Sequence, residues 1–203
     1  GHFLVAALLM LTPMRQELEG LSPQEAVDAV LRENIHGLEL DQRCVEIAAF
    51  ALALEAWRYE GAGGYRPLPE LNLACSGLSI KAAKEEWQNL SLGRQDLKFG
   101  LRWMYDIFQN APTLGSLINP ERIETGTIVQ WDDLRDAFEQ AIASEQDGDR
   151  IESGVVAQGM ARAASLLTGK YNWVITNPPY LASRKQSTIL REYVDLYYKD
   201  AKT

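Results

Sequence analysis

The stretch YNWVITNPPY, residues 171–180, joins an apolar and aromatic run to an amide, two prolines and a tyrosine. The run at 172–176 is typical of a buried strand. Pro178 and Pro179 cannot continue the hydrogen-bond ladder of a sheet, and each fixes its own φ. The sequence therefore predicts a strand over 172–176 that ends in a stiff corner, from which the Asn177 amide and the Pro178 carbonyl project in a set direction.

This corner suits chemistry on an exocyclic amino group of a nucleobase. Such a nitrogen is a poor nucleophile, because its lone pair is delocalised into the ring. Two acceptors, the Asn177 side-chain oxygen and the Pro178 carbonyl, can take both of its N–H groups and free the lone pair for attack. Tyr180 offers a flat face on which an extruded base would stack. Asn177, Pro178, Pro179 and Tyr180 are therefore candidate catalytic residues.

The rest of the chain alternates predicted helices with short predicted strands. Turn and capping signals together with apolar periodicity define these elements. The alternation predicts an α/β fold with a parallel sheet, in which ligands bind at the carboxyl ends of the strands. The predicted helices cover 3–18 (with Pro13 as a kink or break), 23–34, 43–59, 80–90, 94–110, 132–146, 152–168 and 189–197, and the further strands cover 35–41 and 71–76.

Composition limits the kinds of site that the chain can hold. The 203 residues are enough for one domain with a core, and the formal net charge is −8. This acidity argues against a nucleic-acid surface within the chain. Two cysteines and two histidines without ligand spacing predict neither a disulfide framework nor a metal site. The apolar run at 3–11 is too short to span a membrane, so we expect a buried helix there. The cysteine usage makes a reducing cytoplasm the expected compartment.

The motif at 177–180 resembles the catalytic motif of S-adenosylmethionine-dependent DNA adenine-N6 methyltransferases, in which it follows the fourth strand. GHFL, residues 1–4, is similar to the end of the glycine-rich motif of that family. The resemblance implies that Gly1 approaches the methionine part of the cofactor and that Phe3 lines its pocket. It also implies a Rossmann-like methyltransferase sheet, S-adenosyl-L-methionine as the cofactor, and methyl transfer to the N6 amino group of adenine in DNA.

Glu39 matches the acidic residue that closes the second strand in this family. A carboxylate at this place accepts hydrogen bonds from both ribose hydroxyls of an adenosyl group, and Leu40 would flank the adenine. Asp41 instead fits the N-cap of the next helix. The family commonly has an acidic residue after the third strand, but the stretch at 74–78 has none. Ser76 or a backbone carbonyl would then take its place in the cofactor site.

The spacing of these motifs resembles the large modular methyltransferases of restriction-modification and BREX-type phage-defence systems. Residues 80–169 would be a helical insertion between the third and fourth strands. Residues 1–203 would be a partial catalytic domain, because the first strand and most of the glycine-rich motif would precede Gly1. Double-stranded DNA would be gripped mainly by a target-recognition domain outside the chain, and other subunits of a defence system are possible partners. Arg184, Lys185 and Arg191 could still contact phosphates.

Three alternatives remain open. A protein-glutamine methyltransferase also uses the NPPY motif, but those enzymes lack a long insertion before it. A cytosine-N4 methyltransferase usually carries Ser at the first motif position, where this chain has Asn177. The third alternative is a non-catalytic fragment that serves as an interaction module.

Overall fold

The computed structural model describes residues 1–77, 95–120, 148–176 and 186–199, together with residues 136, 139, 140 and 143. The predicted helix at 80–90 and the motif at 177–180 lie outside the described residues. The elements, in chain order, are α1 (His2–Glu19), α2 (Pro23–Ala29), the π-helical turn η1 (Val30–Asn34), β1 (His36–Glu39), α3 (Gln42–Arg58), β2 (Asn72–Cys75), α5 (Gln95–Phe108), α6 (Ala111–Leu114), the 3-10 turn η2 (Gly115–Leu117), α8 (Gly148–Thr168) and α9 (Thr188–Tyr197).

Two strands form the sheet in the described part of the chain, and they are parallel as predicted. Leu38 of β1 lies opposite Ala74 of β2. The helix that connects them, α3, packs on both strands. This βαβ unit brings the carboxyl ends of β1 and β2 to the same edge of the sheet. The arrangement is compatible with a methyltransferase fold.

Local signals start two of the helices where the sequence predicts. The Ser22 side chain accepts a hydrogen bond from the backbone N–H of Glu25, and the Glu25 carboxylate accepts one from the backbone N–H of Ser22, 2.9 Å away. This reciprocal capping box starts α2 at Pro23. The Asp41 carboxylate accepts a hydrogen bond from the Arg43 backbone N–H at 2.9 Å and caps α3. The predicted capping role of Asp41 is therefore confirmed.

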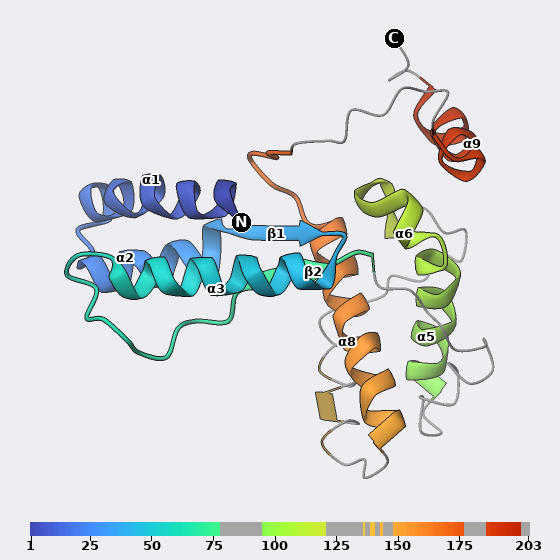
Figure 1. The fold of residues 1–203 in the computed structure, drawn as a ribbon, viewed down its shortest axis with the longest axis horizontal. Helices are drawn as coiled ribbons and strands as arrows, with labels where there is room; N and C mark the ends of the chain where they lie inside the picture. Colours follow the sequence, from blue (N-terminus) through green and yellow to red (C-terminus); the bar gives the residue numbers. More distant parts are fainter. Residues whose placement is uncertain are drawn as a thin grey trace.

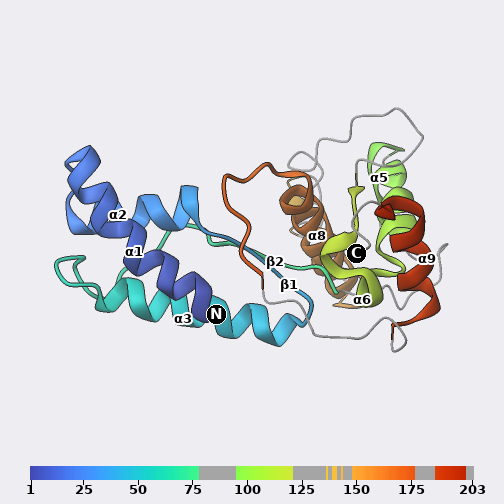
Figure 2. The same cartoon turned by 90° about the horizontal axis from the view of Figure 1, so that it is seen from above.

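The described residues form two apolar core clusters, one on each side of β2. Leu8, Leu31, Leu52 and Leu73 belong to the cluster made by α1, α2, η1 and α3. Ala74, the next residue of β2, belongs to the cluster of α5, α6 and α8. Because successive side chains of a strand point to opposite faces, β2 joins the two clusters. Figures 1 and 2 show the two groups of helices on either side of the short sheet.

The strand predicted over 172–176 does not form. These residues adopt no regular structure, and Trp173 and Ile175 are 87% and 66% exposed. Figure 1 shows the segment, in orange, leaving the end of α8 and standing away from the sheet. The physical reason is that a strand needs a neighbour to complete its backbone hydrogen bonds, and neither β1 nor β2 pairs with this segment.

One alternative of the prediction for Pro13, a kink or a break, is excluded. α1 runs through Pro13 without a break. Pro13 has no backbone N–H to donate to the Leu9 carbonyl. Both residues lie on the exposed side of α1, so water can donate to this carbonyl instead. The prediction that the apolar run at 3–11 forms a buried helix is wrong in part, because Leu9 and Met10 are exposed. Ile47 and Phe50 of α3 are exposed as well. Among the described helices, none combines the length and the hydropathy that crossing a membrane requires.

Candidate active site

The carboxyl ends of β1 and β2 are tied together beyond their last paired residues. The Ser76 backbone N–H donates to the Glu39 carbonyl at 2.8 Å, and the Ser76 hydroxyl donates to the same oxygen at 3.4 Å. The Cys75 Sγ lies 3.3 Å from the Leu40 carbonyl and donates to it. Three predicted cofactor-binding residues, Glu39, Leu40 and Ser76, are therefore brought together at one edge of the sheet.

The Glu39 carboxylate is exposed at this edge. Its Oε1 accepts a hydrogen bond from the Leu40 backbone N–H at 2.7 Å, which fixes the direction of the side chain. The second oxygen forms no hydrogen bond with the described residues. Beside it the Leu40 side chain is 46% exposed. An acceptor for hydroxyl groups next to an apolar side chain fits the ribose and adenine of an adenosyl group.

Asp41 differs from Glu39 although it is only two residues away. Its carboxylate accepts hydrogen bonds from the Arg43 side chain, at 3.2 Å from Nε and 2.9 Å from Nη2. These bonds and the one from the Arg43 backbone hold the pKa of the Asp41 carboxyl below its usual value. Because Asp41 is already committed to capping and to this ion pair, Glu39 is the carboxylate available to a ligand.

Ser76 is 2% exposed, and its hydroxyl is directed to the Glu39 carbonyl. In this arrangement the hydroxyl holds the two strand ends together. Whether Ser76 also contacts a cofactor stays a prediction. The cofactor-binding role of the residue has to be tested separately from this structural contact.

Gly77 is a residue of this edge that the sequence reasoning missed. A Cβ atom added there would collide with the Leu40 carbonyl oxygen and would lie 2.9 Å from its carbonyl carbon. Only glycine therefore allows the chain after β2 to come this close to the chain after β1. The available sequence signal was the small-residue run Ala74-Cys75-Ser76-Gly77 at the end of the strand.

Gly1 and Phe3 lie at the start of α1, where that helix meets α3 and β1. A Cβ atom at Gly1 would lie 3.6 Å from the Ala48 Cα of α3. The next turn is close to the sheet, since a Cβ at Gly37 in β1 would lie 3.3 Å from Leu4 Cδ1. Phe3 itself is exposed. The structure thus brings the GHFL segment to the middle of β1, two residues before Glu39.

The predicted catalytic residues Asn177, Pro178, Pro179 and Tyr180 lie outside the described residues, as do Arg184 and Lys185. Thr176 is the last described residue before this motif. Arg191 lies on α9 and is exposed. Their roles in catalysis and in phosphate contact stay predictions.

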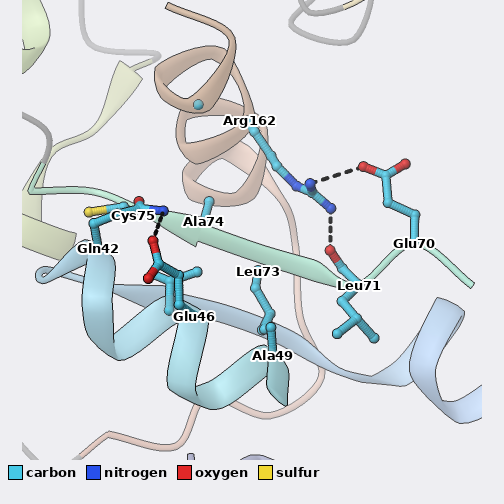
Figure 3. A pocket seen from close by; sticks show the side chains of 11 residues that line it. Gln42, Glu46, Ala49, Glu70, Leu71, Leu73, Ala74, Cys75 and Arg162 are labelled. Atoms are coloured by element: carbon cyan, nitrogen blue, oxygen red, sulfur yellow. Dashed lines mark hydrogen bonds and ion pairs between the residues drawn. The ribbon is translucent and has the colours of Figure 1, made fainter. Parts of the chain in front are cut away.

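A hollow of about 360 Å³ lies beside β2, between α3 and α8 (Figure 3). Arg162 of α8 donates to the Leu71 carbonyl and forms an ion pair with Glu70, with Nη1 and Oε1 2.9 Å apart. At the other end, Gln42 and Glu46 of α3 face each other. Neither Glu39 nor Leu40 lines this hollow. The hollow is therefore distinct from the edge that carries the candidate cofactor residues.

Comparison with known proteins identifies the class of this protein. The model of the Eco57I restriction-modification methylase family matches residues 33–203, and the chain belongs to that family. The matched range begins just before β1 and includes the motif at 177–180. No solved structure matches the chain.

Two curated relatives align with the whole chain. The adenine-specific methyltransferase PglX of Lacticaseibacillus casei (strain Zhang) is 25% identical over 214 residues. The adenine-specific methyltransferase BrxX of Escherichia coli O9:H4 (strain HS) is 24% identical over 228 residues. The chain spans 17% and 18% of the lengths of these two proteins.

Proposed function

We propose that this chain carries the cofactor site and the catalytic motif of an enzyme that methylates the N6 amino group of adenine in DNA, within a restriction-modification or phage-defence system. The observation that supports this most directly is the position of Glu39. Its exposed carboxylate stands beside Leu40, at the carboxyl edge of a parallel pair of strands. The membership of the chain in a family of restriction-modification methylases supports the same function.

The proposed cofactor is S-adenosyl-L-methionine, which supplies an electrophilic methyl group when it is bound. The Glu39 carboxylate would accept hydrogen bonds from the ribose hydroxyls, and Leu40 would flank the adenine. Gly1 and Phe3 would line the methionine part. Ser76, whose hydroxyl already bonds to the Glu39 carbonyl, would support the edge from the side of β2.

The chain itself would activate the target nitrogen. The Asn177 side-chain oxygen and the Pro178 carbonyl would accept the two N–H groups of adenine N6, and Pro179 would keep the corner stiff. These acceptors would also stabilise the positive charge that develops on the nitrogen as the methyl group is transferred. Tyr180 would stack on the extruded base.

The proposed fold extends the observed strand pair to a Rossmann-like methyltransferase sheet. In it, β1 and β2 are the second and third strands, residues 80–169 are a helical insertion, and residues 172–176 become the fourth strand. The DNA would be held mainly by a recognition domain outside residues 1–203, and the setting would be cytoplasmic. The exposure of Trp173 and Ile175 supports the assignment of residues 172–176 as the fourth strand, because pairing in a larger sheet would bury both side chains.

The test is a methyl-transfer assay on the complete protein with isotopically labelled S-adenosylmethionine and unmethylated bacterial DNA. The modified base is identified by mass spectrometry. We expect label in N6-methyladenine. Asn177→Ala should lower kcat by about 10²- to 10³-fold or more, the loss seen when one such hydrogen-bonding group is removed, while the affinity for S-adenosylmethionine stays unchanged.

Glu39→Gln is the matched variant for the cofactor site. It removes the charge but keeps the size of the side chain, so the affinity for S-adenosylmethionine should fall by roughly 10- to 100-fold, as expected for hydrogen bonds to a charged group. Label in protein instead of DNA would favour a protein-glutamine methyltransferase. Cofactor binding without any transfer, in the presence of the partner subunits, would support a non-catalytic module.

A further inference from the structure

The hollow beside β2 (Figure 3) is a cavity that the proposed methyl transfer does not use. It lies where α3 and α8 both pack on β2. Its volume of about 360 Å³ is at the lower end of the range for pockets that hold small ligands. The chemical groups along its wall, and the order in which they lie, define the kind of ligand that fits.

The middle of the hollow is apolar. Val45 and Ala49 of α3 line it, together with Leu73 of β2. These side chains form no hydrogen bonds, so the part of a ligand that lies here is held by apolar contact alone. An aliphatic chain meets this condition.

One end of the hollow is formed by Gln42 and Glu46, in the first turns of α3. The Gln42 Nε2 donates to the Glu46 Oε1 at 3.5 Å, the limit for such a bond. The second Glu46 oxygen and the Gln42 side-chain oxygen accept no hydrogen bond from a described residue, and no described Lys or Arg pairs with Glu46. This end therefore offers hydrogen-bond acceptors and a negative charge that no cation balances within the described residues.

The opposite end of the hollow is formed by Glu70 and Arg162. The Arg162 Nη1 lies 2.9 Å from the Glu70 Oε1, and the same guanidinium donates to the Leu71 carbonyl. These bonds hold the Glu70 carboxylate at this end, and its second oxygen accepts no hydrogen bond from a described residue. With Glu46, the charged side chains that line the hollow carry a net charge of −1. The lining thus has one carboxylate at each end and an apolar stretch between them.

We propose that this hollow binds an aliphatic diamine or polyamine. One ammonium group binds to Glu46 and Gln42, the methylene chain packs against Ala49 and Leu73, and a second ammonium group binds to Glu70. An ammonium group has three donors and no acceptor, which matches ends whose open groups are acceptors. The negative lining disfavours an anion, and the apolar middle disfavours a hard metal ion, which needs oxygen ligands around it. This binding goes beyond the proposed function and does not depend on it.

The test is isothermal titration calorimetry of the complete protein with putrescine, spermidine and butylamine. We expect one site per chain for putrescine and for spermidine. Butylamine has the same aliphatic chain as putrescine but a single ammonium group, so it should bind more weakly. The affinity for putrescine should fall as the salt concentration rises, because salt screens exposed charges.

Three variants locate the binding in the hollow. Glu46→Gln keeps the size of the side chain and removes its charge, so the affinity for putrescine should fall about 10-fold, the low end for a hydrogen bond to a charged group. Glu70→Gln should lower it by about two- to fivefold, the range for an exposed ion pair, since the Glu70 side chain is 68% exposed. Ala49→Leu fills the apolar middle without changing any charge and should abolish the binding.

Glu55→Gln is the matched control. Glu55 belongs to α3, as Glu46 does, but it does not line the hollow, so the affinity should stay unchanged. Equal weakening by Glu46→Gln and Glu55→Gln would mean that the amines respond only to the net charge of the protein, and the proposal would be wrong.

Three other results would also overturn the proposal: putrescine binding that survives Ala49→Leu, equal affinities for butylamine and putrescine, or no binding of putrescine or spermidine to the wild-type protein. Circular dichroism checks that each variant is folded. None of these measurements involves methyl transfer, so a failure of the proposed function leaves the test of the hollow intact.

Discussion

Two short stretches that the sequence predicts as strands have different structures in this protein. Residues 35–39 enter the strand β1, and Ile35 at their start is 3% exposed. Residues 172–176, which are richer in strand-favouring side chains, form no strand, and Ile175 is 66% exposed. The stretch at 35–39 has a parallel partner, β2, and packs against α3, whereas the stretch at 172–176 pairs with neither of the described strands. The comparison shows that residues with high β propensity form a strand only where a neighbouring strand supplies the backbone hydrogen bonds.

The sharpest test of this comparison is the same substitution in both stretches. Ile35→Ala should lower the free energy of unfolding of the 203-residue chain by about 2–5 kcal/mol, because it removes a buried side chain and leaves a cavity. Ile175→Ala should change it by less than about 0.5 kcal/mol, as is usual at exposed positions. Urea unfolding followed by circular dichroism measures both. Equal losses would mean that residues 172–176 are packed in solution, and the contrast between the two stretches would be wrong.

The next prediction concerns the edge formed by β1 and β2. Gly77→Ala should destabilise the chain by about 1–3 kcal/mol, the usual effect of forcing an atom into a packed place, because the added Cβ collides with the Leu40 carbonyl. The affinity for S-adenosylmethionine should fall as well, since Leu40 would move. Isothermal titration calorimetry measures that affinity.

Gly148→Ala is the control for Gly77→Ala. Gly148 begins α8, and a Cβ atom there would have no neighbour within 4 Å. This variant should leave both the stability and the affinity for the cofactor unchanged. If the two glycine variants behaved alike, the close approach of the two strand ends would not be needed for the cofactor site.

The smallest effect is expected at a helix start, where local sequence alone decides the structure. Ser22→Ala should lower the free energy of unfolding by about 1 kcal/mol, the usual value for an N-cap serine, because α2 loses its capping box. Thermal unfolding followed by circular dichroism measures the change. A loss as large as that of Ile35→Ala would mean that the cap also holds tertiary contacts.

The same cap should give a dependence on pH. The bonds from the Ser22 side chain and backbone hold the pKa of Glu25 below its usual value. A carboxyl whose pKa is lower in the folded state stabilises the fold above its ordinary pKa, and this contribution is lost as the pH falls through the folded-state pKa. The difference in stability between wild type and Glu25→Gln should therefore be present at neutral pH and shrink in acid. A difference that is constant with pH would contradict the assignment.

The sequence correctly predicted those features that depend on neighbouring residues. Ser22 with Glu25, and Asp41 before α3, predicted the helix starts that the structure has, because a cap involves only residues within one turn. The two short strands and their parallel pairing also followed, since α3 between them is the kind of crossover that parallel strands need. The sequence motif likewise led to the family of which the chain is a member.

By itself, then, the sequence predicted most of the helices that the structure describes, the parallel strand pair, the family, and the Glu39 carboxylate as a site candidate. Only the tertiary structure decided that the apolar residues at 172–176 remain outside the sheet, that Phe50 of α3 is exposed, and that Gly77 lies against the Leu40 carbonyl. The reason is physical. Caps and crossovers depend on residues close in the chain, whereas burial, strand pairing and close backbone approach depend on partners distant in the sequence, which local patterns do not identify.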